Sequence, residues 1–417
     1  MKRNFSRLSL GSTIAIVDRV FRSTALLLAV CLFVTFFVTG AWGAIPGSER
    51  TVLLNLYTSA GGAGWTNNAN WNGPATTECT WFGVTCDAGQ NHVIAIDLHT
   101  NNLAGTLTDL SNLTNLQTFD VSWNQLTGTI PSLSSLTSLA TFFVGGNQLT
   151  GTIPSLSGLT NLVWFGVGYN QLTGTIPSLS GLTNLQTFDL RYNQLTGTIP
   201  SLSGLTNLQH FGVMTNQLTG TLPSLSGLTN LSVFDVSGNQ LTGTLPSLSG
   251  LTNLSIFDVS FNQLTGTIPS LSGLTNLQDF YAGFNQLTGT IPSLSDLTSL
   301  YDFRVNDNLL TGTIPSLSGL TTLQIFRVNN NQLTGNPPAV PSPDNLVNGQ
   351  SSLCPNDLNL IGDPAWDAAT GSTPWFQSCI VTPVSVPTMT EWGMMIFMIF
   401  AGACSVYYLR RRTSPQR

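Results

Sequence analysis

One pattern of apolar and polar positions recurs through the middle of the chain with a period of 23 residues. The unit from Asn170 to Tyr192 reads NQLTGTIPSLSGLTNLQTFDLRY. Apolar residues stand 11, 8, 5 and 3 positions before the first Asn of the next unit. The −5 and −3 positions alternate with mostly polar neighbours, which is the period-two pattern of a short strand with one buried face. One unit cannot bury its own apolar residues, so the pattern predicts stacked coils joined by a parallel sheet.

The first Asn of the unit fixes the register of the repeats. It recurs without insertion at Asn101, Asn124, Asn147, Asn170, Asn193, Asn216, Asn239, Asn262, Asn285, Asn308 and Asn331. Position −5 is Phe in ten units, namely Phe119, Phe142, Phe165, Phe188, Phe211, Phe234, Phe257, Phe280, Phe303 and Phe326. These rings are predicted to stack through the core, and each Asn amide is predicted to turn inward and satisfy backbone groups at the strand end.

The framework L-x-x-L-x-x-L-x-L-x-x-N-x-L, followed by L-T-G-x-I-P, resembles the plant-type subclass of leucine-rich repeat proteins over roughly residues 50–380. The resemblance implies a leucine-rich repeat solenoid: a curved right-handed coil with a parallel β-sheet on its concave face, an irregular or 3-10 convex face, and capped ends. It also implies protein recognition or adhesion. This chain departs from the family in its 23-residue unit, where 24 is usual, and in its Phe column, where Leu is usual.

The solenoid is expected to carry a cap at each end. Residues 45–92 resemble the N-terminal cap of the family, with a helix starting near Ser48 and a disulfide between Cys79 and Cys86. Residues 337–382 are predicted to cover the other end, with a disulfide between Cys354 and Cys379. The repeats occupy residues 93–336. Disulfides are typical of exported proteins.

The two ends of the chain are predicted to be targeting segments. Residues 1–44 combine a basic stretch, an apolar run and small residues, as in a secretory signal peptide; a retained signal anchor is the alternative. Residues 383–392 are expected to be a linker with a sorting motif, 393–409 a transmembrane helix and 410–417 a basic cytoplasmic tail. The stretch VPTMTEWG resembles the bacterial IPTL-CTERM sorting motif, which implies an exported, cell-envelope protein of a Gram-negative bacterium. A permanent anchor is the alternative.

The low content of charged residues and the high hydrophobic content argue against two classes of protein. Only 8% of the residues are charged, and the single lysine is Lys2. A nucleic-acid binder needs clustered Lys and Arg, so that class is not expected. Disorder is not expected either, because 41% of the chain is hydrophobic.

No catalytic constellation is visible in the sequence. There is no nucleophile elbow, Walker or G-x-G-x-x-G pattern, so we expect neither an enzyme nor a cofactor. The three histidines, His92, His99 and His210, are expected to lie apart from any shared group of cysteine and carboxylate, which argues against a zinc site.

The positions that vary between units are −6, −4, −2 and −1, which are expected to face the concave sheet or its rim. Aromatic residues there form two predicted groups. The first holds Trp164, Tyr169 and Tyr192 and is extended toward the N-terminus by Trp123 and Phe143; the second holds Phe261, Tyr281 and Phe284. Arg191, Arg304 and Arg327 are predicted polar anchors. Exposed apolar patches mark binding sites. The six aromatic residues of the two groups and the three arginines are therefore the candidate ligand-binding residues. The alternative is that the rings only stack on each other and cover the sheet.

Acidic residues recur in the same columns of neighbouring units. The predicted pairs are Asp97 with Asp120 and Asp235 with Asp258 at −4, and Asp279 with Asp302 at −6. A calcium ion would relieve their repulsion; solvated carboxylates, with Arg304 paired to Asp302 or Asp279, are the expected alternative.

The sequence therefore predicts an exported leucine-rich repeat protein that recognises a protein, or a glycan, through its concave sheet. Two alternatives remain open. Regular Thr rows such as Thr173 and Thr175, then Thr196 and Thr198, suit a structural or ice-adhering surface. Some plant-type relatives inhibit carbohydrate-degrading enzymes, which the resemblance leaves as a third function.

Overall fold

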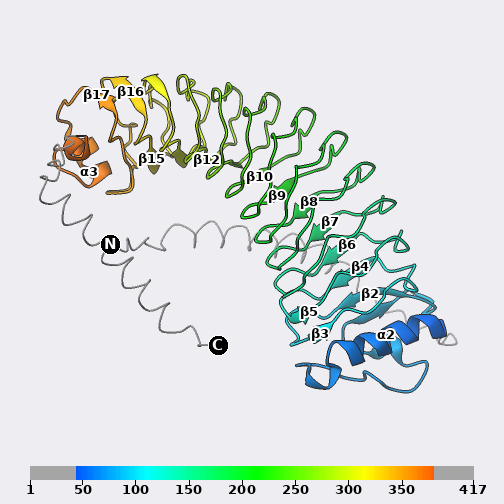
Figure 1. The fold of residues 1–417 in the computed structure, drawn as a ribbon. Coiled ribbons are helices and arrows are strands. Elements are labelled where there is room, and N and C mark those ends of the chain that lie inside the picture. The colour runs from blue at the N-terminus through cyan, green and yellow to red at the C-terminus, as the bar shows by residue number, and fades with distance from the viewer. Residues whose placement is uncertain (1–43, 380–417) are drawn as a thin grey trace, which may run out of the picture. The chain divides into compact units, whose positions relative to one another are not determined.

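The computed structural model describes residues 44–379, and these residues form one continuous stack of coils (Figure 1). Twelve strands make the main sheet, ordered β1-β2-β4-β6-β7-β8-β9-β10-β11-β12-β13-β15. Its strands are β1 (Val84–Cys86), β2 (Val93–Asp97), β4 (Thr118–Asp120), β6 (Thr141–Phe143), β7 (Trp164–Gly166), β8 (Thr187–Asp189), β9 (His210–Gly212), β10 (Val233–Asp235), β11 (Ile256–Asp258), β12 (Asp279–Tyr281), β13 (Asp302–Arg304) and β15 (Ile325–Arg327). From β2 onward all neighbours are parallel, and the strands line the inner side of the arc in Figure 1. The predicted solenoid is confirmed.

The core follows the apolar columns of the repeat. In one representative turn, Leu182, Leu185, Phe188 and Leu190 are all at most 1% exposed. The ten Phe rings from β4 to β15 form an unbroken column, with ring centroids 5.3–5.9 Å apart and ring planes within 14–19° of parallel. Offset stacking adds about 0.5–1.5 kcal/mol per pair to the burial of each ring, so this column ties every turn to the next.

The Asn of each unit completes the backbone hydrogen bonding at the strand end. The Asn216 side-chain amide donates to the carbonyls of Leu190 and Val213, each at 3.1 Å, and its oxygen accepts from the Leu195 amide at 3.0 Å. The predicted structural role of this column is confirmed. Each Asn bonds to its own turn and to the preceding one, so neighbouring coils are held in register.

A second, narrower ladder runs along the L-T-G-T segments. Its regular strands are β3 (Ala104–Thr106), β5 (Gln125–Thr127), β14 (Thr311–Thr313), β16 (Gln332–Gly335) and β17 (Asp357–Leu358). Between them, single Thr–Thr bridges link the turns, from Thr129–Thr150 to Thr290–Thr311. The Gly between the two Thr residues has a left-handed backbone, as at Gly174 with φ 76°, and a Cβ there would lie 2.7 Å from the Thr152 methyl carbon. Glycine is required at this position because of both constraints.

The N-terminal cap covers the first coil with α2 (Gly47–Ser59), which buries Leu53 and Leu56 completely. The 3-10 turns η1 (Gly62–Gly64) and η2 (Glu78–Thr80) follow. Trp71 lies between Trp65 and Trp81, with ring centroids 4.9 and 5.0 Å away. Beside this cluster the predicted Cys79–Cys86 disulfide is confirmed.

The C-terminal cap consists of α3 (Pro364–Thr370) and η3 (Trp375–Ser378). Trp366 is fully buried and lies 6.2 Å from Phe326, where it closes the Phe column. The Cys354–Cys379 disulfide is confirmed. The predicted signal peptide, sorting motif and membrane helix lie outside the described residues. Within residues 44–379, no helix has the length and apolar character needed to cross a membrane.

Candidate functional site

Four columns of side chains form the concave face. Positions −6, −4 and −2 of each repeat lie on the face itself, and position −1 lies at its rim. In β8 the side chain of Phe188 points into the core, so its neighbours Thr187 and Asp189, at −6 and −4, point to the other face. Arg191 at −2 continues that face, and Tyr192 at −1 stands where the strand turns away. Each turn repeats this arrangement, and the four variable positions form columns across the sheet.

The rim column holds a left-handed backbone in every repeat. Trp123, Tyr169, Tyr192, Phe261 and Phe284 have φ between 53° and 55°. Bulky side chains seldom adopt this conformation, which costs roughly 1–2 kcal/mol per residue. Trp123, Phe261 and Phe284 are nonetheless 58%, 56% and 44% exposed.

Stacked ring pairs run along this column. Tyr169 and Tyr192 lie 4.5 Å apart, Trp123 lies 5.7 Å from Tyr169, and Phe261 lies 4.3 Å from Phe284. We call these five residues the rim aromatics. They form two apolar patches separated by Thr215 and Gly238, in which Trp123, Phe261 and Phe284 are exposed and the two tyrosines are half-buried.

The structure places the predicted aromatic residues in different columns of the repeat. Trp164 begins β7 at −6, whereas Tyr169 and Tyr192 stand at −1 beyond the ends of their strands. Tyr281 ends β12 at −4, where its hydroxyl donates to Asp302 at 3.1 Å. The repeat period was sufficient to place all of these residues at variable positions. The ring contacts described above, however, join residues that share the −1 column.

The three predicted arginine anchors all have partners within the chain. Arg191 donates to both oxygens of Asp189, with a closest contact of 2.6 Å, and its guanidinium lies 6.0 Å from the Tyr169 ring. Arg304 makes the same bidentate pair with Asp302, as the alternative reading of the charges predicted, and lies 5.1 Å from the Tyr281 ring.

Arg327 donates to the Gln350 carbonyl at 2.8 Å. In β13 and β15, Arg304 and Arg327 are register partners, and both guanidinium groups lie on the concave side. The arginines are therefore fixed features of the face rather than free side chains.

Carboxylates also align across neighbouring strands, as predicted. Asp235 and Asp258 are register partners, as are Asp279 and Asp302. Burial raises the pKa of Asp258, and the neighbouring Asp235 adds to that effect. Burial, with Asp302, raises the pKa of Asp279 to about 6.

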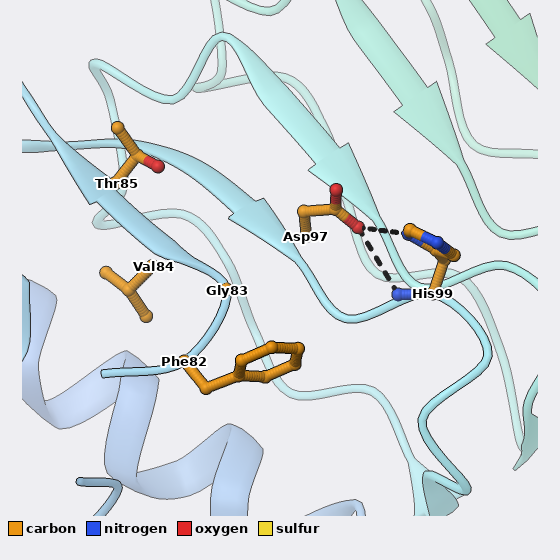
Figure 2. Close-up of a pocket in the computed structure, with 6 residues that line it drawn as sticks. All are labelled: Phe82, Gly83, Val84, Thr85, Asp97 and His99. Carbon is orange, nitrogen blue, oxygen red and sulfur yellow. Dashed lines mark hydrogen bonds and ion pairs between the residues drawn. The ribbon is translucent and has the colours of Figure 1, made fainter. Parts of the chain in front are cut away.

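One histidine lies among carboxylates, a grouping that the sequence analysis did not anticipate. His99 Nδ1 lies 2.6 Å from Asp97 Oδ1, and Asp120 joins them, so that one ligand atom from each residue falls within 4.8 Å of the others. The parallel register of β2 and β4 aligns the two Asp residues, and His99 follows Asp97 by two positions. A hollow lined by Phe82, Gly83, Val84, Thr85, Asp97 and His99 opens beside this group (Figure 2).

The Thr ladder presents a different surface. Thr150 donates its backbone N–H to the Gly128 carbonyl at 2.7 Å and its hydroxyl to the same oxygen at 3.1 Å. The second Thr of each segment instead forms a β-bridge with the first Thr of the next turn. Thr129, for example, pairs with Thr150, and its methyl group lies against Gly151. The second Thr residues are exposed in a row of nine: Thr129, Thr152, Thr175, Thr198, Thr221, Thr244, Thr267, Thr290 and Thr313.

Two family models match parts of the chain. The leucine rich repeat N-terminal domain matches residues 46–87, and the leucine rich repeat matches residues 115–136, 184–205 and 230–251. These matches cover the N-terminal cap and three of the repeated coils.

Solved structures share the fold. The ectodomain of the Arabidopsis receptor kinase HAESA, in complex with an N-terminally extended IDA peptide hormone, is 28% identical with a TM-score of 0.60 over 75% of this chain and 53% of that one. The plant peptide hormone receptor RGFR1, in complex with RGF2, is 30% identical with a TM-score of 0.56 over 67% and 49%. A plant ice-binding protein is 27% identical with a TM-score of 0.54 over 66% and 90%.

The chain spans about half the length of these two receptor ectodomains. The chain carries a leucine-rich repeat N-terminal domain followed by leucine-rich repeats, and its fold is the leucine-rich repeat solenoid.

Proposed function

We propose that this protein recognises a protein partner through its concave sheet, with the rim aromatics as anchors. The observation that carries the proposal is the placement of five aromatic side chains on a left-handed backbone position, at the edge of an open sheet. Glycine or Asn would occupy that position with less strain, as Gly146, Gly238 and Asn330 do. Strained residues persist where the surrounding structure holds them in place, and they cluster at functional sites.

Stacking between rings does not offset this cost fully, because Phe261 and Phe284 remain about half exposed after they stack. Tyr, Trp and Arg dominate the energetic centres of protein interfaces, since they bury large areas with few rotatable bonds. The ion pair Arg191–Asp189 supplies fixed charges beside Tyr169 of the first patch, and Arg304–Asp302 supplies them beside Tyr281 on the concave face. A partner that covers both patches would be oriented by those charges.

The solenoid limits the entropic cost of binding. Each coil is bonded to its neighbours through the Phe column, the Asn column and the sheet, so the anchors are held before the partner arrives. The two receptor ectodomains with this fold were solved with peptide hormones, which supports a protein ligand over a small molecule. Together with the two disulfides, the predicted targeting segments support a role at the cell envelope.

The experiment is capture of partners by the immobilised full chain, followed by their identification and by affinity measurement. In a fivefold variant each rim aromatic is replaced by Asn, which tolerates the left-handed backbone: Trp123→Asn, Tyr169→Asn, Tyr192→Asn, Phe261→Asn and Phe284→Asn. The matched control changes the Thr ladder at Thr175→Lys and Thr198→Lys. We expect the rim variant to lose affinity at least tenfold and the control to retain it. Equal affinity in both variants, or a purely glycan ligand, would contradict the proposal.

A second candidate function is supported by the Thr ladder. The nine exposed Thr residues stand at the spacing of adjacent parallel strands, about 4.8 Å, and each methyl group is held against the Gly of the next turn. Such a row presents hydroxyl and methyl groups at a fixed period, which suits an ordered water surface. The similarity to a plant ice-binding protein, over 90% of that protein, supports the same function.

Thermal hysteresis of the full chain distinguishes the candidates. If the Thr ladder binds ice, the wild-type chain lowers the freezing point below the melting point, and the Thr175→Lys, Thr198→Lys control loses that activity. The rim variant then retains it. Absence of hysteresis in the wild-type chain would remove this candidate and leave the concave proposal unaffected.

A further inference from the structure

The cluster of Asp97, His99 and Asp120 lies at the N-terminal end of the concave sheet, beyond the first rim aromatic. Among residues 44–379 it is the one group of three His, Cys, Asp or Glu side chains whose ligand atoms all fall within 4.8 Å of one another. Asp97 and His99 are more than half exposed, so solvent reaches the cluster directly. The adjacent hollow in Figure 2 leaves room for water or another ligand.

The three side chains are positioned by the backbone and by neighbouring groups. Asp97 and Asp120 are register partners in β2 and β4. The Ser122 hydroxyl and amide both donate to Asp120 Oδ1, at 2.6 and 2.9 Å, and orient the carboxylate without using Oδ2. Such outer hydrogen bonds hold ligating carboxylates in protein metal sites.

The same chain contains a matched pair that lacks the histidine. Asp235 and Asp258 are also register partners at −4, and Ser237 and Ser260 donate to them in the same way. At the −2 position, however, Ser237 stands where the N-terminal cluster has His99. The ring nitrogen is therefore what distinguishes the N-terminal cluster from an ordinary pair of aligned carboxylates.

We propose that Asp97, His99 and Asp120 form a binding site for a divalent first-row transition cation such as Zn²⁺. One imidazole nitrogen and two carboxylate oxygens are ligands that Zn²⁺ accepts, with water in the remaining position. A nitrogen donor disfavours Ca²⁺ and Mg²⁺, which select oxygen ligands. The hollow beside His99 is the side from which water completes the coordination.

Electrostatics supports the site. Two aligned carboxylates repel each other, and a divalent cation removes the repulsion while satisfying Asp120 Oδ2.

The test is isothermal titration of the purified full chain with ZnCl₂, after treatment with EDTA and dialysis. We expect one site in the wild-type chain and at least about a tenfold loss of affinity in both His99→Ala and Asp120→Asn. The matched control, Asp235→Asn with Asp258→Asn, should bind like the wild type. Circular dichroism checks that each variant is folded, and a parallel titration with CaCl₂ should give no binding at this site.

Three results would overturn the proposal. These are no saturable Zn²⁺ binding by the wild-type chain, equal Zn²⁺ affinity in His99→Ala, or Ca²⁺ binding that His99→Ala leaves unchanged. Because the readout is binding of the ion itself, the test is independent of whether the concave face recognises a protein.

Discussion

At the residue scale, the same side chain has opposite roles in different columns. Phe257 at −5 is fully buried between Phe234 and Phe280, whereas Phe261 at −1 is more than half exposed on a left-handed backbone. Position within the 23-residue unit, and not residue type, decides whether an aromatic ring holds the fold together or is available to a partner.

The first prediction compares these two positions. Phe261→Asn should change the free energy of unfolding by no more than about 1 kcal/mol, because relief of the left-handed strain offsets the lost stacking with Phe284. Phe257→Ala should cost about 3–5 kcal/mol, since it leaves a cavity in the Phe column. Chemical denaturation of both variants measures the difference. A loss at Phe261 as large as that at Phe257 would show that the rim ring is part of the core.

The second prediction concerns the Asn column. Asn216→Ala should destabilise the chain by about 1–3 kcal/mol, because the backbone groups of Leu190, Leu195 and Val213 lose their partner inside the solenoid. The control is Asn207→Ala, whose exposed amide donates only to the Thr183 carbonyl. It should cost well under half as much in the same denaturation experiment. Equal losses would mean that the inner Asn is not specially important.

At the element scale, strand pairing converts repeated sequence positions into rows of like charge. The sequence predicted these rows because a fixed period, combined with a parallel register, places equal positions side by side. It did not predict that His99 would join Asp97 and Asp120, since that depends on side-chain reach within one face. Trp164 and Tyr281 were grouped with the rim aromatics because all stand at variable positions, but they occupy the −6 and −4 columns rather than −1.

The third prediction is a pH dependence of stability. Burial raises the pKa of Asp258, and burial with Asp302 raises that of Asp279 to about 6, against 3.8 as the ordinary value. The folded state therefore holds these protons more tightly than the unfolded chain, so the stabilisation is complete below about pH 4 and is lost as the pH rises through about 6. Urea denaturation should give a free energy of unfolding that falls between pH 4 and pH 7.

The double variant Asp258→Asn, Asp279→Asn should flatten that slope. The control Asp296→Asn should leave it unchanged over the same range, because hydrogen bonds from Ser272 and Gly273 lower the pKa of this exposed carboxyl. A slope that persists undiminished in the double variant would assign the pH dependence to other groups.

At the scale of the whole molecule, the solenoid is a sum of nearly identical coils, each bonded mainly to its neighbours. The sequence was sufficient to predict this architecture, because the period is uninterrupted over ten intervals. Both disulfides were predicted from the two local pairs of cysteines that flank the repeats. It was not sufficient to predict the left-handed backbone of the rim column, since the residues there are varied and mostly not Gly.

The fourth prediction follows from this modular architecture. Deletion of one full period, residues 216–238, should leave a cooperative fold with a Tm only a few degrees lower, because every column closes in register. Deletion of residues 216–227 removes about half a coil and should abolish cooperative melting, since it shifts the Phe and Asn columns out of alignment. Thermal melts followed by circular dichroism distinguish the two. Similar melts for both deletions would contradict the stacked register.

The central claim is that the curved sheet, rimmed by aromatic side chains, is the surface that binds a partner. Hydrogen–deuterium exchange of the full chain, with and without a captured protein, tests this claim most directly. The account predicts slower exchange on binding at the turns that follow β4, β7, β8, β11 and β12, with no change along the Thr ladder. Protection confined to the Thr ladder, with the concave strands unaffected, would contradict it.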